Sequence, residues 1–316
     1  MNDNTARAAS IRKLALPLAA LCFVVMLISM YLRLDNAGLG CADWPACYGR
    51  LLTEGPRSHG DMTNARALHR LTASAALVLS IVVAWKSLRP RPIQPVAKNA
   101  VLLLLLMLFL FVIGILSTDP HRVAVSFLNI LGGFGLVLFS WCVLRATDAP
   151  GGGGANPGQG IVLHLGLGTL TASILLGALI GARYAAVTCT SLPVCGGTWW
   201  PVASGWSALD PFVRLAVAPT AGDPGGVALH LLHRYAAVAT LLLLGAAGLR
   251  ALRQPATRAA ARVLLLLLAL AVTLGILSVV SGFNLWLTVA HSASAATLLA
   301  VIVQLQRAAA SRSTGG

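Results

Sequence analysis

Residues 101–115 read VLLLLLMLFLFVIGI, an apolar run with no charge and no polar stripe. An α-helix in water keeps a polar face, whereas a helix that crosses a bilayer needs about 20 predominantly apolar residues. The run extends far enough on both sides to meet this length. The sequence therefore predicts a membrane-spanning helix over residues 99–117.

The rest of the chain repeats this pattern. Seven further apolar runs predict spans over residues 14–33, 67–87, 123–144, 161–182, 227–249, 261–281 and 285–306. Of the 316 residues, 57% are hydrophobic and only 10% are charged, against roughly 25% charged in soluble domains. The basic residues behind the net charge of +14 lie in short tracts between the runs, which argues against nucleic-acid binding. We expect an all-α integral membrane protein with eight transmembrane helices.

Lysine and arginine in the loops predict the orientation of these spans. With the N-terminus inside, the inner segments hold 14 of the 23 basic residues and two acids, and the outer segments hold nine basic residues and seven acids. Cytoplasmic loops carry an excess of lysine and arginine. The expected topology is therefore N-in and C-in, in a bacterial-type inner membrane.

The chain also contains an internal repeat. Three features recur in the same order: CADWPAC at 41–47 and CTSLPVC at 189–195, His69-Arg70 and His233-Arg234, and GILS at 114–117 and 275–278. Duplicated segments of this kind indicate a fold built from repeated units. We expect two pseudo-symmetric four-helix bundles, residues 1–147 and 161–316, joined by a glycine-rich linker at 148–160.

Four of the six cysteines form two pairs in loops that the topology places on the outer face, Cys41 with Cys47 and Cys189 with Cys195. Disulfides persist in such an oxidising compartment, so structural loop cross-links are the favoured interpretation. A thiol relay and a four-thiolate metal site are the alternatives. Cys22 and Cys142 lie within apolar runs and are expected to be packing residues.

Three histidines, His69, His233 and His291, lie just inside the outer ends of predicted spans. Polar side chains within spans are costly, so they suggest a functional site. His233 and His291 lie on alternate helices of the second bundle, where two imidazoles can face each other and bind haem iron.

We also assign expected roles to two arginines and two further histidines. Arg70 and Arg234 are candidates for pairing with haem propionates, with interfacial snorkelling as the alternative. His164 begins a span at the opposite face, and His121 is expected to be a solvated loop residue.

These motifs together resemble the haem A synthase family. The resemblance covers nearly the whole chain and rests on GLGCADWPAC at 38–47, the second cysteine loop, both His-Arg pairs and His291. It implies that His233 and His291 bind haem b in the C-terminal half, and that His69 serves the N-terminal half. There the C8 methyl group of the substrate haem O would be oxidised to a formyl group, giving haem A for terminal oxidases.

The resemblance breaks at two positions of the N-terminal half. The family usually has a histidine partner for the His69 position, but the repeat alignment places Asn129 there. It also tends to have a glutamate three residues before that histidine, where this chain has Arg66. The alternative functions are a non-catalytic haem-binding oxidase assembly factor and a transporter of repeated halves.

The resemblance also implies partners. These are haem O, the farnesyltransferase that produces it, and membrane lipid. The sequence does not identify the membrane electron donor or acceptor. It also does not decide whether the protein forms a homo-oligomer.

Overall fold

The computed structural model describes residues 3–55, 60–116, 119–146, 157–255 and 257–310. Most of the predicted linker, residues 148–156, lies outside them. Across the described residues the chain consists of helices and loops, with two isolated β-bridges. The all-α prediction is confirmed.

Eight long helices account for the predicted spans, and each is long and apolar enough to cross a membrane. They are α1 (Asp3–Asn36), α3 (Gly60–Leu88), α4 (Ala97–Leu116), α5 (Val123–Arg145), α6 (Pro157–Ala182), α7 (Pro224–Ala251), α8 (Arg258–Val280) and α9 (Leu285–Ala310). Three short helices lie in loops: α2 (Leu51–Glu54), η1 (Ala186–Thr188) and η2 (Ala203–Leu209). The protein is a multi-pass membrane protein.

Several helices are longer than the predicted spans. Helix α1 has 34 residues because helix-forming flanks extend its apolar segment in both directions. Helix α6 begins at Pro157, where proline is tolerated because the first backbone N–H groups of a helix have no partner within it.

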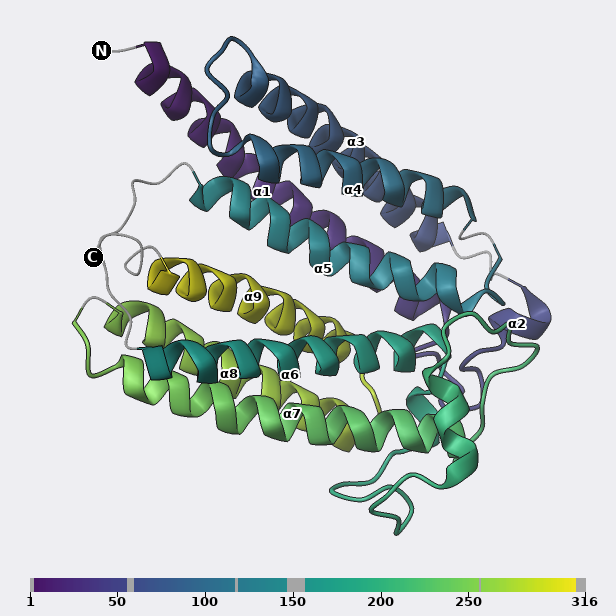
Figure 1. Cartoon of the computed structure of the whole chain (residues 1–316). Coiled ribbons are helices and arrows are strands. Elements are labelled where there is room, and N and C mark those ends of the chain that lie inside the picture. The colour runs from purple at the N-terminus through teal and green to yellow at the C-terminus, as the bar shows by residue number, and fades with distance from the viewer. Residues whose placement is uncertain (1–2, 56–59, 117–118, 147–156, 256, 311–316) are drawn as a thin grey trace.

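The helices pack as two groups (Figure 1). The N-terminal bundle contains α1, α3, α4 and α5, and the C-terminal bundle contains α6 to α9. Between the bundles, α5 packs on α6 and α9, while α1 packs on α9. The start of α1 and the end of α9 lie at the same end of the molecule, opposite the cysteine loops (Figure 1).

Glycines let neighbouring helices approach closely. A Cβ at Gly132 of α5 would lie 2.2 Å from Leu110 of α4, and a Cβ at Gly166 of α6 would lie 2.4 Å from Leu244 of α7. Small residues of this kind are typical of helix interfaces in membranes, where association depends on close van der Waals packing.

The segment directly after the first cysteine loop packs on the outer loops between α6 and α7. A Cβ at Gly49 would lie 2.2 Å from Cβ of Ala218, and the ring centroids of Tyr48 and Tyr184 are 6.2 Å apart. Burial raises the pKa of the Tyr48 phenol, and the nearby Arg33 guanidinium partly offsets this. This segment therefore contributes to the junction between the bundles.

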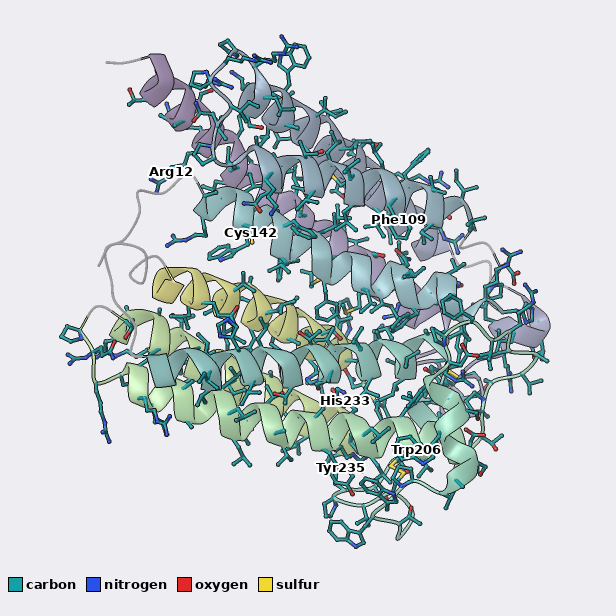
Figure 2. The ribbon with its side chains drawn as sticks, viewed as in Figure 1. Arg12, Phe109, Cys142, Trp206, His233 and Tyr235 are labelled. Atoms are coloured by element: carbon teal, nitrogen blue, oxygen red, sulfur yellow. A yellow bond between two sulfur atoms is a disulfide. The ribbon has the colours of Figure 1, made fainter. Side chains whose placement is uncertain are left out.

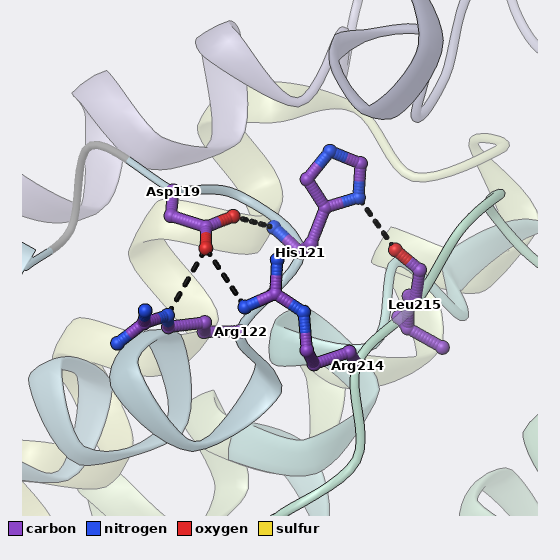
Figure 3. Close-up of polar contacts among 5 residues, drawn as sticks. All are labelled: Asp119, His121, Arg122, Arg214 and Leu215. Carbon is purple, nitrogen blue, oxygen red and sulfur yellow. Dashed lines mark hydrogen bonds and ion pairs between the residues drawn. The ribbon is translucent and has the colours of Figure 1, made fainter.

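A second junction, which we call the outer clip, joins residues 119–122 to residues 214–215 (Figure 3). Asp119 pairs with Arg122 and Arg214 at 3.0 Å each, and His121 Nδ1 donates to the Leu215 carbonyl at 2.6 Å. Partial burial alone would raise the pKa of Asp119, but the His121 amide and the two guanidinium groups hold it below its ordinary value. The expectation of a solvated His121 was wrong, because this side chain is half-buried and hydrogen-bonded.

Candidate haem-binding site

His233 of α7 and His291 of α9 face each other inside the C-terminal bundle. Their ring centroids are 6.3 Å apart and the ring planes are nearly perpendicular, at 82°. Figure 2 shows His233 beside α6 and α7, within the bundle rather than in the outer loops. The two residues are 58 positions apart in the sequence, and the structure brings them together as predicted.

Each of these imidazoles is fixed through Nδ1. His233 Nδ1 lies 2.9 Å from the Ser173 carbonyl oxygen, and His291 Nδ1 lies 2.9 Å from the Ala271 carbonyl oxygen. A carbonyl can only accept, so Nδ1 carries the proton in both rings, and a neutral ring then has its lone pair on Nε2. Metal-binding histidines almost always donate their other ring N–H in this way. Both Nε2 atoms are thus prepared to bind a metal.

A glycine of the neighbouring helix lies against each ring. A Cβ at Gly177 of α6 would lie 3.3 Å from Cε1 of His233, and a Cβ at Gly275 of α8 would lie 3.0 Å from Cε1 of His291. Any larger residue would press on the imidazole. The two glycines therefore leave room for the orientations that the Nδ1 hydrogen bonds fix.

The spacing of the rings fits one metal ion between them. Two imidazoles bound on opposite sides of a metal, at about 2.0–2.1 Å from nitrogen and with ring centres roughly 1.1 Å further out, have centroids roughly 6.3 Å apart. The observed separation of 6.3 Å matches this value. Within the described residues, no group of three or more His, Cys, Asp or Glu side chains could hold a metal. Two imidazoles with free Nε2 atoms are a donor set that haem iron accepts, so the residues present fit this group.

His230 is a residue that the sequence analysis did not single out. It lies one helical turn before His233 and is only 4% exposed. Its Nε2 donates to the Ala185 carbonyl at 2.9 Å, and its ring packs edge-on against Phe283. The i, i+3 spacing with His233 could have identified it, because such residues share a helix face. Its hydrogen bond ties α7 to the outer segment that leads into the second cysteine loop.

Arg234 connects the histidine site to the second cysteine loop. Its Nη1 donates to the carbonyl oxygens of Pro193 and Val194, at 3.1 and 3.2 Å. Its Nη2 is buried and has no hydrogen-bond partner in the described part of the chain. A buried donor without a partner is costly, so this atom is suited to a ligand carboxylate. Arg70 is exposed on α3.

The helices of the N-terminal bundle can be compared position by position with those of the C-terminal bundle, and one of the two histidines has a histidine counterpart. His69 is nine residues after the first residue of α3, and His233 is nine residues after the first residue of α7. Asn129 and His291 are each six residues after the first residue of their helices, α5 and α9. The same comparison matches Arg66 to His230.

His69 is half-buried, and the described residues give it no imidazole partner like that of His233. An asparagine side chain can hydrogen-bond but is a weaker iron ligand than imidazole. Among the described residues, the two-imidazole pair is therefore found in the C-terminal bundle alone.

The remaining predicted residues are His164 and the four loop cysteines. His164 is exposed on α6, with its Nδ1 2.6 Å from the Gly160 carbonyl. The cysteines pair within their own loops, with Cα atoms 6.5 Å apart for Cys41–Cys47 and 5.3 Å apart for Cys189–Cys195. Both separations lie in the usual disulfide range. Each pair is therefore placed to form a disulfide within its own loop, as the disulfide interpretation predicts.

Comparison with known proteins shows which chains this one is similar to. A family model described as "Cytochrome oxidase assembly protein" matches residues 122–303. A curated relative named heme A synthase, from Shewanella oneidensis, is 28% identical over 305 residues, 89% of this chain and 91% of that protein. Another of that name, from Halalkalibacterium halodurans, is 25% identical over 244 residues, 73% of this chain and 72% of that protein. The segment matched by the family model contains both His233 and His291.

Proposed function

Because the chain belongs to the cytochrome oxidase assembly protein family, whose model matches more than half of its residues, we propose that it is a membrane oxidoreductase of the haem A synthase type. It converts haem O to haem A by oxidising the C8 methyl group of the porphyrin to a formyl group. The product serves terminal oxidase assembly. Two relatives named heme A synthase, one aligned over 89% of this chain, support this assignment.

The observation that carries the proposal is the His233–His291 pair, with both Nδ1 atoms bound to backbone carbonyls. These two residues would hold haem b through Nε2. Bound there, haem b would supply a one-electron redox centre. Arg234 pairs through its unsatisfied Nη2 with a propionate carboxylate, and its Nη1 keeps the second cysteine loop in place.

Haem O binds in the N-terminal bundle, with His69 as the residue closest to the chemistry and Arg70 near the outer interface. A single imidazole leaves one face of the substrate iron open and allows the product to leave. Oxidation of the methyl group to a formyl group takes up one oxygen atom from water and releases four electrons and four protons, so an acceptor in the membrane must receive the electrons. The C-terminal bundle, which would hold the b-type redox centre, packs on α5 and α1 of the N-terminal bundle, and α1 in turn packs on α3, the helix of His69.

The excess of basic residues in the inner loops supports a bacterial inner membrane with both termini inside. The cysteine loops, and the outer ends of α3 and α7, then face the outer compartment. Haem O would arrive within the membrane from the farnesyltransferase that makes it.

One observation favours a second function. Arg66 and Asn129 stand where the family usually has a glutamate and a histidine, so the N-terminal bundle has lost an acid and a ligand. A chain that keeps haem b but not the oxidation would be a non-catalytic haem-binding assembly factor.

The test is co-expression with a haem O source, followed by chromatography of the haems extracted from the purified protein. The enzyme yields haem A together with protohaem, and His69→Ala removes haem A while it leaves the protohaem. Protohaem alone would identify the assembly factor. Absence of any haem would contradict both functions and favour a transporter.

A further inference from the structure

A cavity lies between α1 and α5 at the end of the molecule opposite the cysteine loops. Its volume is about 420 Å³, and it is far from the histidine pair and from the outer clip. Six residues line it: Ala9, Arg12, Lys13 and Leu16 of α1, and Leu144 and Arg145 of α5. Figure 2 labels Arg12, which lies at the end of the molecule opposite the cysteine loops.

The lining combines two kinds of side chain. Arg12, Lys13 and Arg145 are cationic and exposed, and no carboxylate is among the residues that line the cavity. The guanidinium of Arg145 lies 6.0 Å from the centre of the Trp141 ring, a cation–π distance that holds this charge near the opening. The remaining walls are apolar, and Leu16 is 63% exposed.

We propose that this cavity binds an anionic phospholipid, with its phosphate among the three cations and an acyl chain along Leu16 and Leu144. Basic pockets between transmembrane helices are suited to anionic headgroups, because the charges lie at the headgroup level of the bilayer. The apolar walls favour a lipid over free phosphate, which has no apolar part to bury. This inference does not depend on the proposed enzymatic function.

The site also has a directional arrangement. Arg12 and Lys13 precede Leu16 on α1, and Leu144 precedes Arg145 near the end of α5. On both helices the cations lie nearer the membrane surface than the leucine. A phosphate at the surface with its acyl chain toward the bilayer centre matches this order.

The test titrates lipid-depleted protein with phosphatidylglycerol and follows bound lipid by native mass spectrometry. Each cation near an anionic headgroup is worth roughly a fivefold change in affinity. We expect Arg12→Ala with Arg145→Ala to weaken binding roughly 25-fold, and Lys13→Gln alone to weaken it roughly fivefold. The double substitution Arg12→Lys with Arg145→Lys keeps the charge and should retain most of the binding.

The matched control is Arg253→Ala with Arg262→Ala, which removes two exposed cations at the same end of the molecule, near the turn between α7 and α8. It should bind phosphatidylglycerol like the wild type. Equal losses in both double variants would mean general surface charge and would overturn the site. Equal binding of phosphatidylcholine, or displacement of the lipid by inorganic phosphate, would overturn the lipid as its ligand. Lys13→Gln keeps the test decisive if the double variant fails to fold.

Discussion

Replacing Gly275 by alanine tests how the structure orients the haem ligand. The new methyl carbon would lie 3.0 Å from Cε1 and 3.3 Å from Nδ1 of His291. Carbon atoms pack at about 3.5–4.0 Å, so the imidazole must move by roughly half an ångström. This displacement disturbs the 2.9 Å hydrogen bond from Nδ1 to the Ala271 carbonyl. Loss of such an outer partner typically lowers metal affinity roughly 10–100-fold, and we expect haem affinity to fall by that factor.

The assay is the rate at which purified protein loses haem to an excess of apomyoglobin, followed by absorbance. Two other glycine variants serve as comparisons for Gly275→Ala in this assay. Gly177→Ala should have a smaller effect, because its Cβ would lie 3.3 Å from Cε1 of His233. Gly114→Ala, in the matching GILS motif of α4, should have none, because nothing lies within 4 Å of that Cβ. Wild-type haem retention in Gly275→Ala, or equal loss in Gly114→Ala, would refute the reasoning.

Three further predictions concern other parts of the molecule. Asn129→His should add a second low-spin haem signal to the absorbance spectrum, because it places an imidazole at the position that His291 occupies in α9; an unchanged spectrum would contradict the helix matching. The lowered folded-state pKa of Asp119 stabilises the fold above the ordinary carboxyl pKa of about 3.9, and this contribution is lost as the pH falls through the lowered value. The Tm of Asp119→Asn should therefore be below that of the wild type at neutral pH, with the difference shrinking in acid; a constant difference would exclude titration of the clip. Mass spectrometry of unreduced peptides should show Cys41–Cys47 and Cys189–Cys195, and links crossed between the loops would be inconsistent with the structure.

Much of the fold was predictable because a bilayer imposes a local rule. Each helix must present a long apolar segment, so the run at 101–115 and its seven counterparts reveal the spans without knowledge of their contacts. The same rule revealed His233 and His291, since an imidazole inside a span is rare. Their common depth followed from counting along each helix.

The features that were missed depend on contacts between distant residues. Nothing near Gly275 in the sequence indicates that His291, sixteen residues later, would lie against it. Nor does the sequence around His121 indicate a carbonyl acceptor at Leu215. His230 is different, because its spacing from His233 was visible and only its burial was not. The two-fold relation between the bundles stays a prediction that the matching helix positions support.

The central claim is that His233 and His291 together hold haem b, and the reduced-minus-oxidised absorbance spectrum of purified variants tests it most directly. His233→Ala and His291→Ala should each lose most of the low-spin b-type signal, because each removes one of the two imidazoles, and His230, one turn from His233, is held by its hydrogen bond to the Ala185 carbonyl. His164→Ala should keep the wild-type spectrum, since this residue is exposed on α6 and bonded to the Gly160 carbonyl. A spectrum that survives loss of His291 but not loss of His164 would contradict the account.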